Sequence, residues 1–471
     1  RCCDVRRTAH QPTGPESIEG AVVVMSSGEA GRGLVADYVV VGAGAMGMAF
    51  VDEILSHSDA TVALVERRNK PGGHWNNAYP HVRLHQPSFF YGLNSAQLGS
   101  DHIDDVGCNQ GLSELASGAE VLTYFDHAMQ RRFLPSGRVH FFANTEYRDG
   151  VATVAPSGET FELTAGVAVV DAAYMNVTVP STTPPRYEVG GGATVIAPND
   201  LASCVNPDGY VIVGAGKTAF DAIMWLLDQR VVPDSIRWVV PRDSWLINRA
   251  VTQPGAGFKI GDQLQIIAEA DSVKSMWLDL ESAGHMLRVD ADRMPDMYRC
   301  ATVTEIELEQ LRRVTNVIRM GRVRRITQTS IDLDDGSVET TPGTVHVDCT
   351  ADGLERRPVV PVFDGRRITL QTVRACQQGF SAALIGYLAT RTDLDEASKN
   401  ELAGVIPHPD IPMDFVSSSL KHIHNVGRWS RDAGVARWMA EARLNPTGGG
   451  SGPDLGLAIA AVAKLEAFLA E

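Results

Sequence analysis

The N-terminal part of the chain alternates short continuous apolar runs with a segment of helical spacing. The valines at 39–41 predict a buried strand, residues 45–56 predict a helix, and residues 61–65 predict a second strand. The helix residues expected to face inward are Met46, Phe50 and Leu55. A strand, a helix and another strand in this order predict a parallel βαβ unit of an α/β fold.

A glycine-rich turn joins the first strand to its helix, and a second such turn lies about 170 residues later. The turns read Gly42-Ala43-Gly44-Ala45-Met46-Gly47 and Gly214-Ala215-Gly216-Lys217-Thr218-Ala219. Glycine allows the backbone to approach a pyrophosphate closely, and the following helix N-terminus offers unpaired N–H groups and partial positive charge. Two such turns predict one site for a flavin dinucleotide and one for the nicotinamide that reduces it.

Charged residues at the strand ends refine this prediction. Glu66 ends the strand at 61–65, and an acid there accepts hydrogen bonds from a ribose. We therefore predict that Glu66 binds a ribose; the alternative is a surface glutamate at a strand end. In the second unit Arg242 follows the strand at 236–240 and suits the 2′-phosphate of NADPH. NADH remains the alternative, because the neighbouring Asp243 could bind its ribose instead.

Composition and charge exclude several classes of protein. With 471 residues, 44% hydrophobic and 21% charged, the chain is long enough for two or three globular domains. A net charge of -15 argues against a nucleic-acid or anionic-membrane surface, because such surfaces are bound through clustered Lys and Arg. The apolar run at 455–469 is short and interrupted by Lys464 and Glu466, so we expect a core-packed helix rather than a membrane span.

The cysteine pattern predicts reduced thiols in a cytoplasmic protein, because seven is an odd number and no C-x-x-C spacing occurs. This pattern disfavours both a disulfide framework and a redox-active dithiol. No metal site is predicted. Residues 1–35, with Met25 among them, lack a secretory signal and are expected to form a poorly ordered extension. The glycine tract at 448–452 is interpreted as a flexible linker.

The loop at 71–92 is rich in aromatic and polar side chains, which is typical of a functional loop. It contains the patterns G-G-x-W and Y-P-x-x-R. Together with the G-x-G-x-x-G turn and Glu66, these motifs resemble the class B flavoprotein monooxygenases, which include the flavin-containing and Baeyer–Villiger monooxygenases. In that superfamily the loop wraps the flavin. The counterparts that the resemblance implies here are Gly73, Trp75, Tyr79 and Arg83.

The resemblance also implies an architecture. It predicts an α/β fold with two Rossmann-type dinucleotide-binding domains, in which the NAD(P)-binding domain is inserted in a discontinuous FAD-binding domain. The chain would return to the FAD domain at 345–353, where Asp352 interrupts an alanine-threonine-glycine stretch. The predicted parts after the extension are 36–185 as the first FAD part, 186–345 as the NADPH domain, and 346–471 as the FAD completion with the substrate side.

The turns and the resemblance together predict the residues that contact FAD or NADPH. They are Gly42, Gly44, Ala45, Met46, Gly47, Glu66, Arg67, Gly73, His74, Trp75, Tyr79, Arg83, Gly214, Gly216, Lys217, Thr218, Arg242 and Asp352. The predicted catalytic residues are Arg83, to offset charge on the reduced flavin, and His85 and Gln86, to hydrogen-bond the ring or its oxygen adduct. The alternative for this trio is a structural role.

Two departures separate the chain from the family pattern. The signature F-x-G-x-x-x-H before the second glycine turn is missing, since residues 185–189 read Pro-Arg-Tyr-Glu-Val. His85 stands where Baeyer–Villiger enzymes carry an aspartate. Both departures concern oxygen transfer more than flavin binding.

The function expected from these observations is an FAD-dependent, NADPH-utilising oxidoreductase of monooxygenase type, which acts on a small molecule with O2. One alternative is an NADPH-dependent flavin reductase or oxidase that releases hydrogen peroxide, and another is a non-catalytic dinucleotide sensor. No motif identifies the substrate or the oligomeric state. The large aromatic residues of the later segments, interpreted as core rather than pocket, are Trp245, Phe258, Tyr298 and Trp429.

Overall fold

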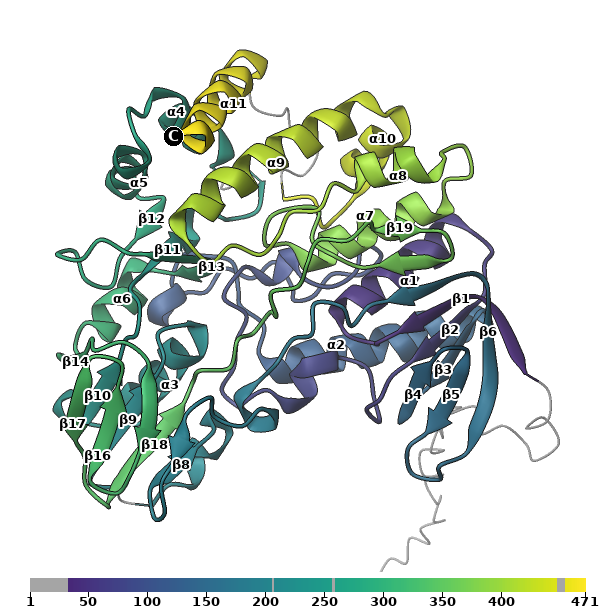
Figure 1. Cartoon of the computed structure of the whole chain (residues 1–471). Helices are drawn as coiled ribbons and strands as arrows, with labels where there is room; N and C mark the ends of the chain where they lie inside the picture. The colour runs from purple at the N-terminus through teal and green to yellow at the C-terminus, as the bar shows by residue number, and fades with distance from the viewer. Residues whose placement is uncertain (1–32, 206, 256–258, 447–453) are drawn as a thin grey trace, which may run out of the picture.

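The computed structural model describes residues 33–205, 207–255, 259–446 and 454–471 (Figure 1). Met25, Phe258 and the glycine tract lie outside the described residues, as does most of the predicted extension. None of the helices in the described ranges is long and apolar enough to cross a membrane.

The helices of the described part of the chain range from 7 to 20 residues in length. They are α1 (Ala45–His57), α2 (Gly118–Ala128), α3 (Lys217–Asp228), α4 (Ile260–Glu269), α5 (Val273–Ser282), α6 (Glu305–Leu311), α7 (Gln378–Thr390), α8 (Glu396–Leu402), α9 (Pro412–Arg431), α10 (Ala433–Glu441) and α11 (Leu455–Ala470). The helix predicted at 45–56 is α1, and the helix predicted at 455–469 is α11.

The first sheet has eight strands, with β1 at its centre between β6 and β2. Its strands are β19 (Phe363–Asp364), β20 (Arg367–Thr369), β6 (Thr160–Asp171), β1 (Leu34–Val41), β2 (Val62–Val65) and β3 (Val139–Phe142) in spatial order, with the hairpin of β4 (Thr145–Arg148) and β5 (Val151–Val154) beside β6. The strands around β1 are parallel, as predicted.

Alternation of side chains along β1 builds two cores, because successive residues face opposite sides of a sheet. Tyr38 and Val40 pack with residues of α1 and α7. Val39 packs on the opposite face with Ala152 of the β4–β5 hairpin. Met46, Phe50 and Leu55 are all buried in the first core, which confirms the predicted inward face of α1.

The second sheet consists of five parallel strands and is covered by a group of helices separate from those of the first sheet (Figure 1). In spatial order its strands are β14 (Asn316–Ile318), β10 (Ile236–Val239), β9 (Gly209–Val213), β18 (Thr344–Asp348) and β8 (Thr194–Ile196). Helices α3 and α6 cover one face. The other face packs on a four-stranded sheet of β17 (Gly336–Glu339), β16 (Ser330–Leu333), β15 (Val323–Ile326) and β7 (Glu188–Val189).

The chain returns to the first sheet later than the sequence indicates. The boundary predicted at 345 falls inside β18, which pairs with β9 and β8 in the second sheet. The chain therefore leaves the second sheet after Asp348. An apolar strand carries no signal for which of two parallel sheets it joins, since both demand the same buried residues.

A third, smaller layer joins the two units. Its three-stranded sheet of β12 (Met286–Leu287), β11 (Ser244–Asn248) and β13 (Met297–Val303) shares a core with α4, α5, α9 and α11. Trp245 and Tyr298 are buried in this core, and Trp429 is buried beneath α7, so these aromatic residues are core residues as interpreted.

Candidate active site

The first glycine turn presents a helix N-terminus with no side-chain cap. Helix α1 begins at Ala45, and its N-cap residue Gly44 makes no side-chain hydrogen bond. The first N–H groups of a helix need partners from outside it, so this end is available to a phosphate. A Cβ atom on Gly47 would overlap the carbonyl oxygen of Gly42. Glycine at position 47 therefore allows α1 to lie this close to the end of β1.

Glu66 is held against this turn by its carboxylate. The side chain is 3% exposed, its Oε2 accepts the N–H of Ala43 at 2.9 Å, and its Oε1 accepts the N–H of Arg68 at 3.0 Å. Glu66 is therefore no surface glutamate. Glu66 lines the cavity at the turn, where the predicted ribose contact would form.

The first cavity has a volume of about 340 Å³ and opens at the first turn. The predicted residues in its wall are Gly42, Gly44, Ala45, Met46, Glu66, Arg67, Gly73 and His74. Cavities of a few hundred Å³ are typical of cofactor sites. The structure thus gathers the predicted FAD residues of the turn and of the strand end in one place.

The second glycine turn has the same construction. Gly214 adopts φ +123°, and a Cβ atom there would lie 2.8 Å from the carbonyl oxygen of Cys349. Helix α3 begins at Lys217, and its N-cap Gly216 also makes no side-chain hydrogen bond. A second N-terminus is therefore available to an anion.

The second cavity, of about 470 Å³, lies between the second turn and the aromatic loop. The predicted residues in its wall are His74, Trp75, Tyr79, Arg83, His85, Gln86, Gly216, Lys217, Thr218 and Asp352. Both cavities are lined by His74, Tyr91, Val177, Leu354 and Gln378. The two glycine turns, far apart in sequence, thus open onto adjoining cavities with a common wall.

Tyr79 links the aromatic loop to the second helix. Its hydroxyl donates to the carboxylate of Asp221 on α3 at 2.7 Å, and Lys217 forms an ion pair with the same carboxylate. Burial raises the pKa of Tyr79 well above its usual value, and the Asp221 charge acts in the same direction. Tyr79 therefore stays protonated and acts as a donor.

His85 is neutral and oriented by β13. Its Nδ1 accepts the backbone N–H of Thr302 at 3.2 Å, so the ring proton sits on Nε2. Burial lowers the pKa of His85 to about 3, and the nearby charges of Lys217 and Arg249 add to the effect. Arg83 is exposed and donates to the carbonyl of Leu115 at 3.1 Å.

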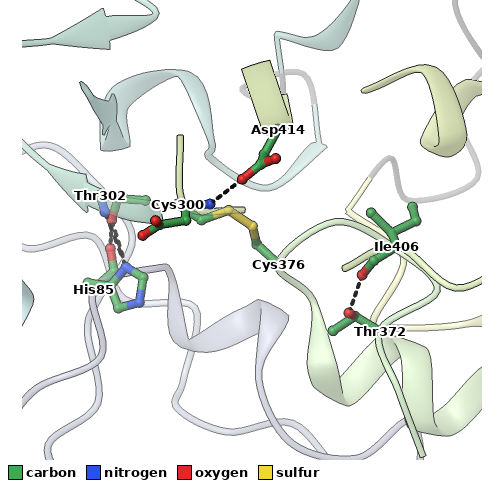
Figure 2. The surroundings of a disulfide bond; sticks show 8 residues. His85, Cys300, Thr302, Thr372, Cys376, Ile406 and Asp414 are labelled. Carbon is green, nitrogen blue, oxygen red and sulfur yellow. Dashed lines mark hydrogen bonds between the residues drawn. A yellow bond between two sulfur atoms is a disulfide. The ribbon is translucent and has the colours of Figure 1, made fainter. Parts of the chain in front are cut away.

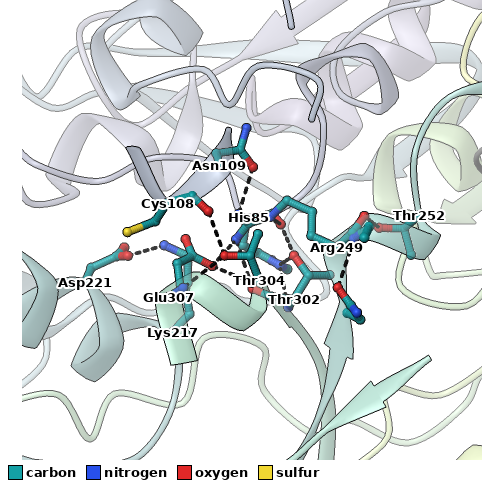
Figure 3. A network of polar contacts seen from close by, with 12 residues as sticks. His85, Cys108, Asn109, Lys217, Asp221, Arg249, Thr252, Thr302, Thr304 and Glu307 are labelled. Atoms are coloured by element: carbon teal, nitrogen blue, oxygen red, sulfur yellow. Dashed lines mark hydrogen bonds and ion pairs between the residues drawn. The ribbon is translucent and has the colours of Figure 1, made fainter. Parts of the chain in front are cut away.

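A buried guanidinium fixes the backbone around His85 (Figure 3). Arg249 is fully buried and donates to the carbonyl of His85 at 2.9 Å and to Asn109 Oδ1 at 2.9 Å. It also forms an ion pair with Glu307 of α6 at 2.8 Å. The network therefore ties the loops that carry His85 and Asn109 to α6 of the second unit.

Arg242 lies outside both cavity walls. Its guanidinium forms a bidentate pair with Asp410 at 2.8 and 3.1 Å, and Arg299 and Arg356 bind the same carboxylate. Burial opposes ionisation of Asp410, but hydrogen bonds from Arg242 and Arg299 outweigh it and hold the pKa of Asp410 far below its usual value. Asp352 pairs with Arg299 at 2.5 Å.

The prediction that all cysteines are reduced thiols is wrong for two of them. Cys300 and Cys376 form a disulfide, with Cα atoms 6.3 Å apart (Figure 2). Their separation of 76 residues matches no cysteine motif. The two cysteines meet only because the tertiary fold brings β13 to the segment before α7. The free cysteines among the described residues are Cys108, Cys204 and Cys349.

Asp221, Arg249, Asp410 and Gln378 are site residues that sequence reasoning missed. Arg249 and Asp410 bind partners distant in sequence, and Gln378 lines both cavities, so no local pattern marks these three residues. Asp221 alone had a local signal, since its spacing of four from Lys217 on a helix allows the ion pair. Among the described residues, no group of three or more His, Cys, Asp or Glu side chains is placed to hold a metal ion.

Comparison with curated proteins finds close relatives. An uncharacterized protein of Mycobacterium tuberculosis (strain ATCC 25618 / H37Rv) is 48% identical over 415 residues, which cover 87% of this chain and 77% of that protein. An uncharacterized protein of Mycobacterium bovis matches with the same values. The chain belongs to the family of these mycobacterial proteins.

A family model described as an NAD(P)-binding Rossmann-like domain matches residues 40–98 of this family member. This match and the sheet topology confirm the predicted α/β fold with Rossmann-type units. The matched segment contains the first glycine turn, which we predict to bind FAD. The description of the family model names NAD(P) there, so the identity of the dinucleotide at this turn belongs to the proposal below.

Solved structures similar to the chain include flavin monooxygenases. An open crystal structure of cyclohexanone monooxygenase is 14% identical with a TM-score of 0.47, covering 76% of this chain and 86% of that one. A flavin-containing monooxygenase from Stenotrophomonas maltophilia is 15% identical with a TM-score of 0.39, covering 73% and 88%. The resemblance predicted from the motifs thus recurs as a distant likeness, and at these values it assigns no activity.

Proposed function

We propose that the protein is an FAD-dependent, NADPH-utilising oxidoreductase of monooxygenase type. The observation that carries this proposal is the common wall between two cavities, each of which opens at a glycine turn and an uncapped helix N-terminus. Two dinucleotides that exchange a hydride need their reactive rings in contact while their pyrophosphates lie apart. Adjoining cavities with separate phosphate sites meet this requirement.

The residues of the first cavity fit FAD. The α1 N-terminus would bind the pyrophosphate, and Glu66 would accept hydrogen bonds from the adenosine ribose. The isoalloxazine ring would lie toward the common wall, near Trp75 and Tyr91, whose indole N–H and hydroxyl are 2.6 Å apart. From the wall of the second cavity Gln377 adds an acceptor, since no described residue hydrogen-bonds its buried Oε1.

The residues of the second cavity fit NADPH. The α3 N-terminus and Thr218 would bind its pyrophosphate, with Lys217 adding charge. Arg242 lies outside the wall of this cavity, but it remains our candidate for the 2′-phosphate because Arg299 and Arg356 also bind its partner Asp410. Those two guanidinium groups would still compensate Asp410 if Arg242 contacted a phosphate.

When bound, FAD would accept a hydride from NADPH and pass electrons to O2. The protein would supply positioning and exclusion of water. His85 would offer Nε2–H as a fixed neutral donor toward the cavity, since Thr302 holds its Nδ1. The aromatic residues Trp75, Tyr79 and Phe90 would shield the common wall from solvent.

A second candidate is a reductase or oxidase that releases hydrogen peroxide. It is favoured by the missing signature before the second turn, where the chain instead forms β7 and pairs with β15. The expected substrate in either case is a small molecule, in view of the cavity size.

The test is the absorption spectrum of the purified protein after reconstitution with FAD. We expect a bound flavin that NADPH bleaches without air. After air is admitted, a spectrum that is neither reduced nor oxidised and persists before the flavin absorption returns would support oxygen transfer, and direct return of the oxidised spectrum with one hydrogen peroxide per NADPH would identify the oxidase. Folded protein that takes up no FAD would end the proposal.

A matched pair of glycine variants tests the second turn. Gly214→Ala introduces a Cβ beside the Cys349 carbonyl at a positive φ, which costs a strain of roughly 1–3 kcal/mol. We therefore expect the NADPH concentration that half-bleaches the flavin to rise about 10- to 100-fold. Gly191→Ala is the control, because nothing lies within 4 Å of its added Cβ. Equal behaviour of both variants would refute the assignment of this turn.

A further inference from the structure

A disulfide lies in the wall of the second cavity, where the proposed function places the reacting rings. Both Cys300 and Cys376 line this cavity. Two residues beyond Cys376, Gln378 lines both cavities, and two residues beyond Cys300, Thr302 holds Nδ1 of His85 (Figure 2). The two ends of the S–S bond thus belong to segments that reach the His85 contact and the wall that the two cavities share.

The backbone at both cysteines is unusual. Cys300 has φ 58° and Cys376 has φ 59°, a left-handed conformation that residues other than glycine seldom adopt. At Cys300 it accompanies a register shift in the pairing of β11 with β13. Such conformations are retained where the surrounding structure imposes them, and they concentrate at functional sites.

The position of Cys376 favours thiol chemistry. It directly precedes Gln377, the N-cap of α7, and no side chain caps this helix of 13 residues. The partial positive charge of a helix N-terminus stabilises a thiolate. Cys349 lines the same cavity, but burial raises the pKa of its thiol well above the usual value, so it stays protonated and does not compete.

We propose that Cys300 and Cys376 form a redox-active pair that accepts two electrons from the reduced flavin. In this step the S–S bond breaks and two S–H bonds form. The reduced flavin supplies two electrons and two protons and returns to its oxidised form, so atoms and charge balance. This inference rests on the proposed function, because it needs a bound flavin at the common wall.

The test reads the disulfide itself. Flavin-loaded protein is reduced without air by illumination with EDTA as electron donor, then denatured, alkylated and digested, and the peptides that contain Cys300 and Cys376 are analysed by mass spectrometry. We expect linked peptides before illumination, two alkylated peptides after it, and a restored link on exposure to air. Flavin-free protein illuminated in the same way should keep the link.

Two variants sharpen the result. Cys376→Ser should abolish the link while the flavin still bleaches, and wild type should take up about four electrons per flavin where this variant takes up about two. Cys204→Ser is the control, since Cys204 is a free cysteine outside both cavity walls, and it should behave as wild type.

The outcomes separate the two proposals. A link that persists although the flavin is fully reduced would overturn the redox pair and leave the proposed function standing. Free thiols at both positions in air-oxidised protein would do the same. A link that opens on illumination while NADPH fails to bleach the flavin would support the redox pair and contradict the use of NADPH. Protein that binds no flavin would overturn both.

Discussion

Replacement of Arg249 by methionine tests whether one buried guanidinium holds the two units together around His85. The side chain is fully buried, and its donors reach His85, Asn109, Thr302 and Glu307. Methionine fills a similar volume but donates nothing. The variant therefore leaves several acceptors and one carboxylate without their partner.

The expected cost follows from these contacts. Breaking a buried ion pair by removal of one partner costs about 3–5 kcal/mol. In the variant, Glu307 is still 21% exposed and still accepts a hydrogen bond from the backbone N–H of Thr304 at 2.8 Å, so its charge is partly compensated. We therefore expect the lower end, a loss of about 3 kcal/mol in the free energy of unfolding.

Urea unfolding followed by tryptophan fluorescence measures this loss. Arg324→Met is the matched control, because Arg324 is 70% exposed in its pair with Asp334 and exposed pairs contribute about 0–1 kcal/mol. Adding Glu307→Gln to Arg249→Met should recover at least about 1 kcal/mol, since no charge is then stranded. Equal losses for Arg249→Met and Arg324→Met would refute the reasoning.

Two further predictions concern the aromatic loop and pH. Tyr79→Phe removes the hydrogen bond to Asp221, which is charge-assisted, and should lower the free energy of unfolding by about 1.5–3 kcal/mol in the same assay; an unchanged midpoint would contradict it. Burial lowers the pKa of His422 from 6.5 to about 3, and the unfolded state therefore binds more protons between these values. The contribution of the neutral, buried His422 to the free energy of unfolding is therefore complete above pH 6.5, and it is lost as the pH decreases toward 4. His422→Leu should reduce this slope by up to about 1.4 kcal/mol per pH unit, an upper limit because the side chain is partly exposed. Identical pH profiles for variant and wild type would contradict that assignment.

The amino-acid sequence by itself determined the local units of the site. Valines at 39–41, the glycine turn and Glu66 at the next strand end predict a βαβ unit, because buried parallel strands and phosphate-binding turns impose strict local demands on residue type. The same reasoning located the second turn at Gly214 and the aromatic loop at 71–92. All of these segments lie at the two cavities in the structure.

Only the tertiary structure decided how these units meet. The adjoining cavities, the Tyr79–Asp221 contact and the Arg249 network join segments more than 50 residues apart, and nothing in their local sequence encodes the partner. The clearest case is the disulfide, since the cysteine count argued for free thiols while the packing of β13 against the segment before α7 brings two of them together. Local propensity specifies elements, whereas long-range pairing depends on how apolar faces fill a common core.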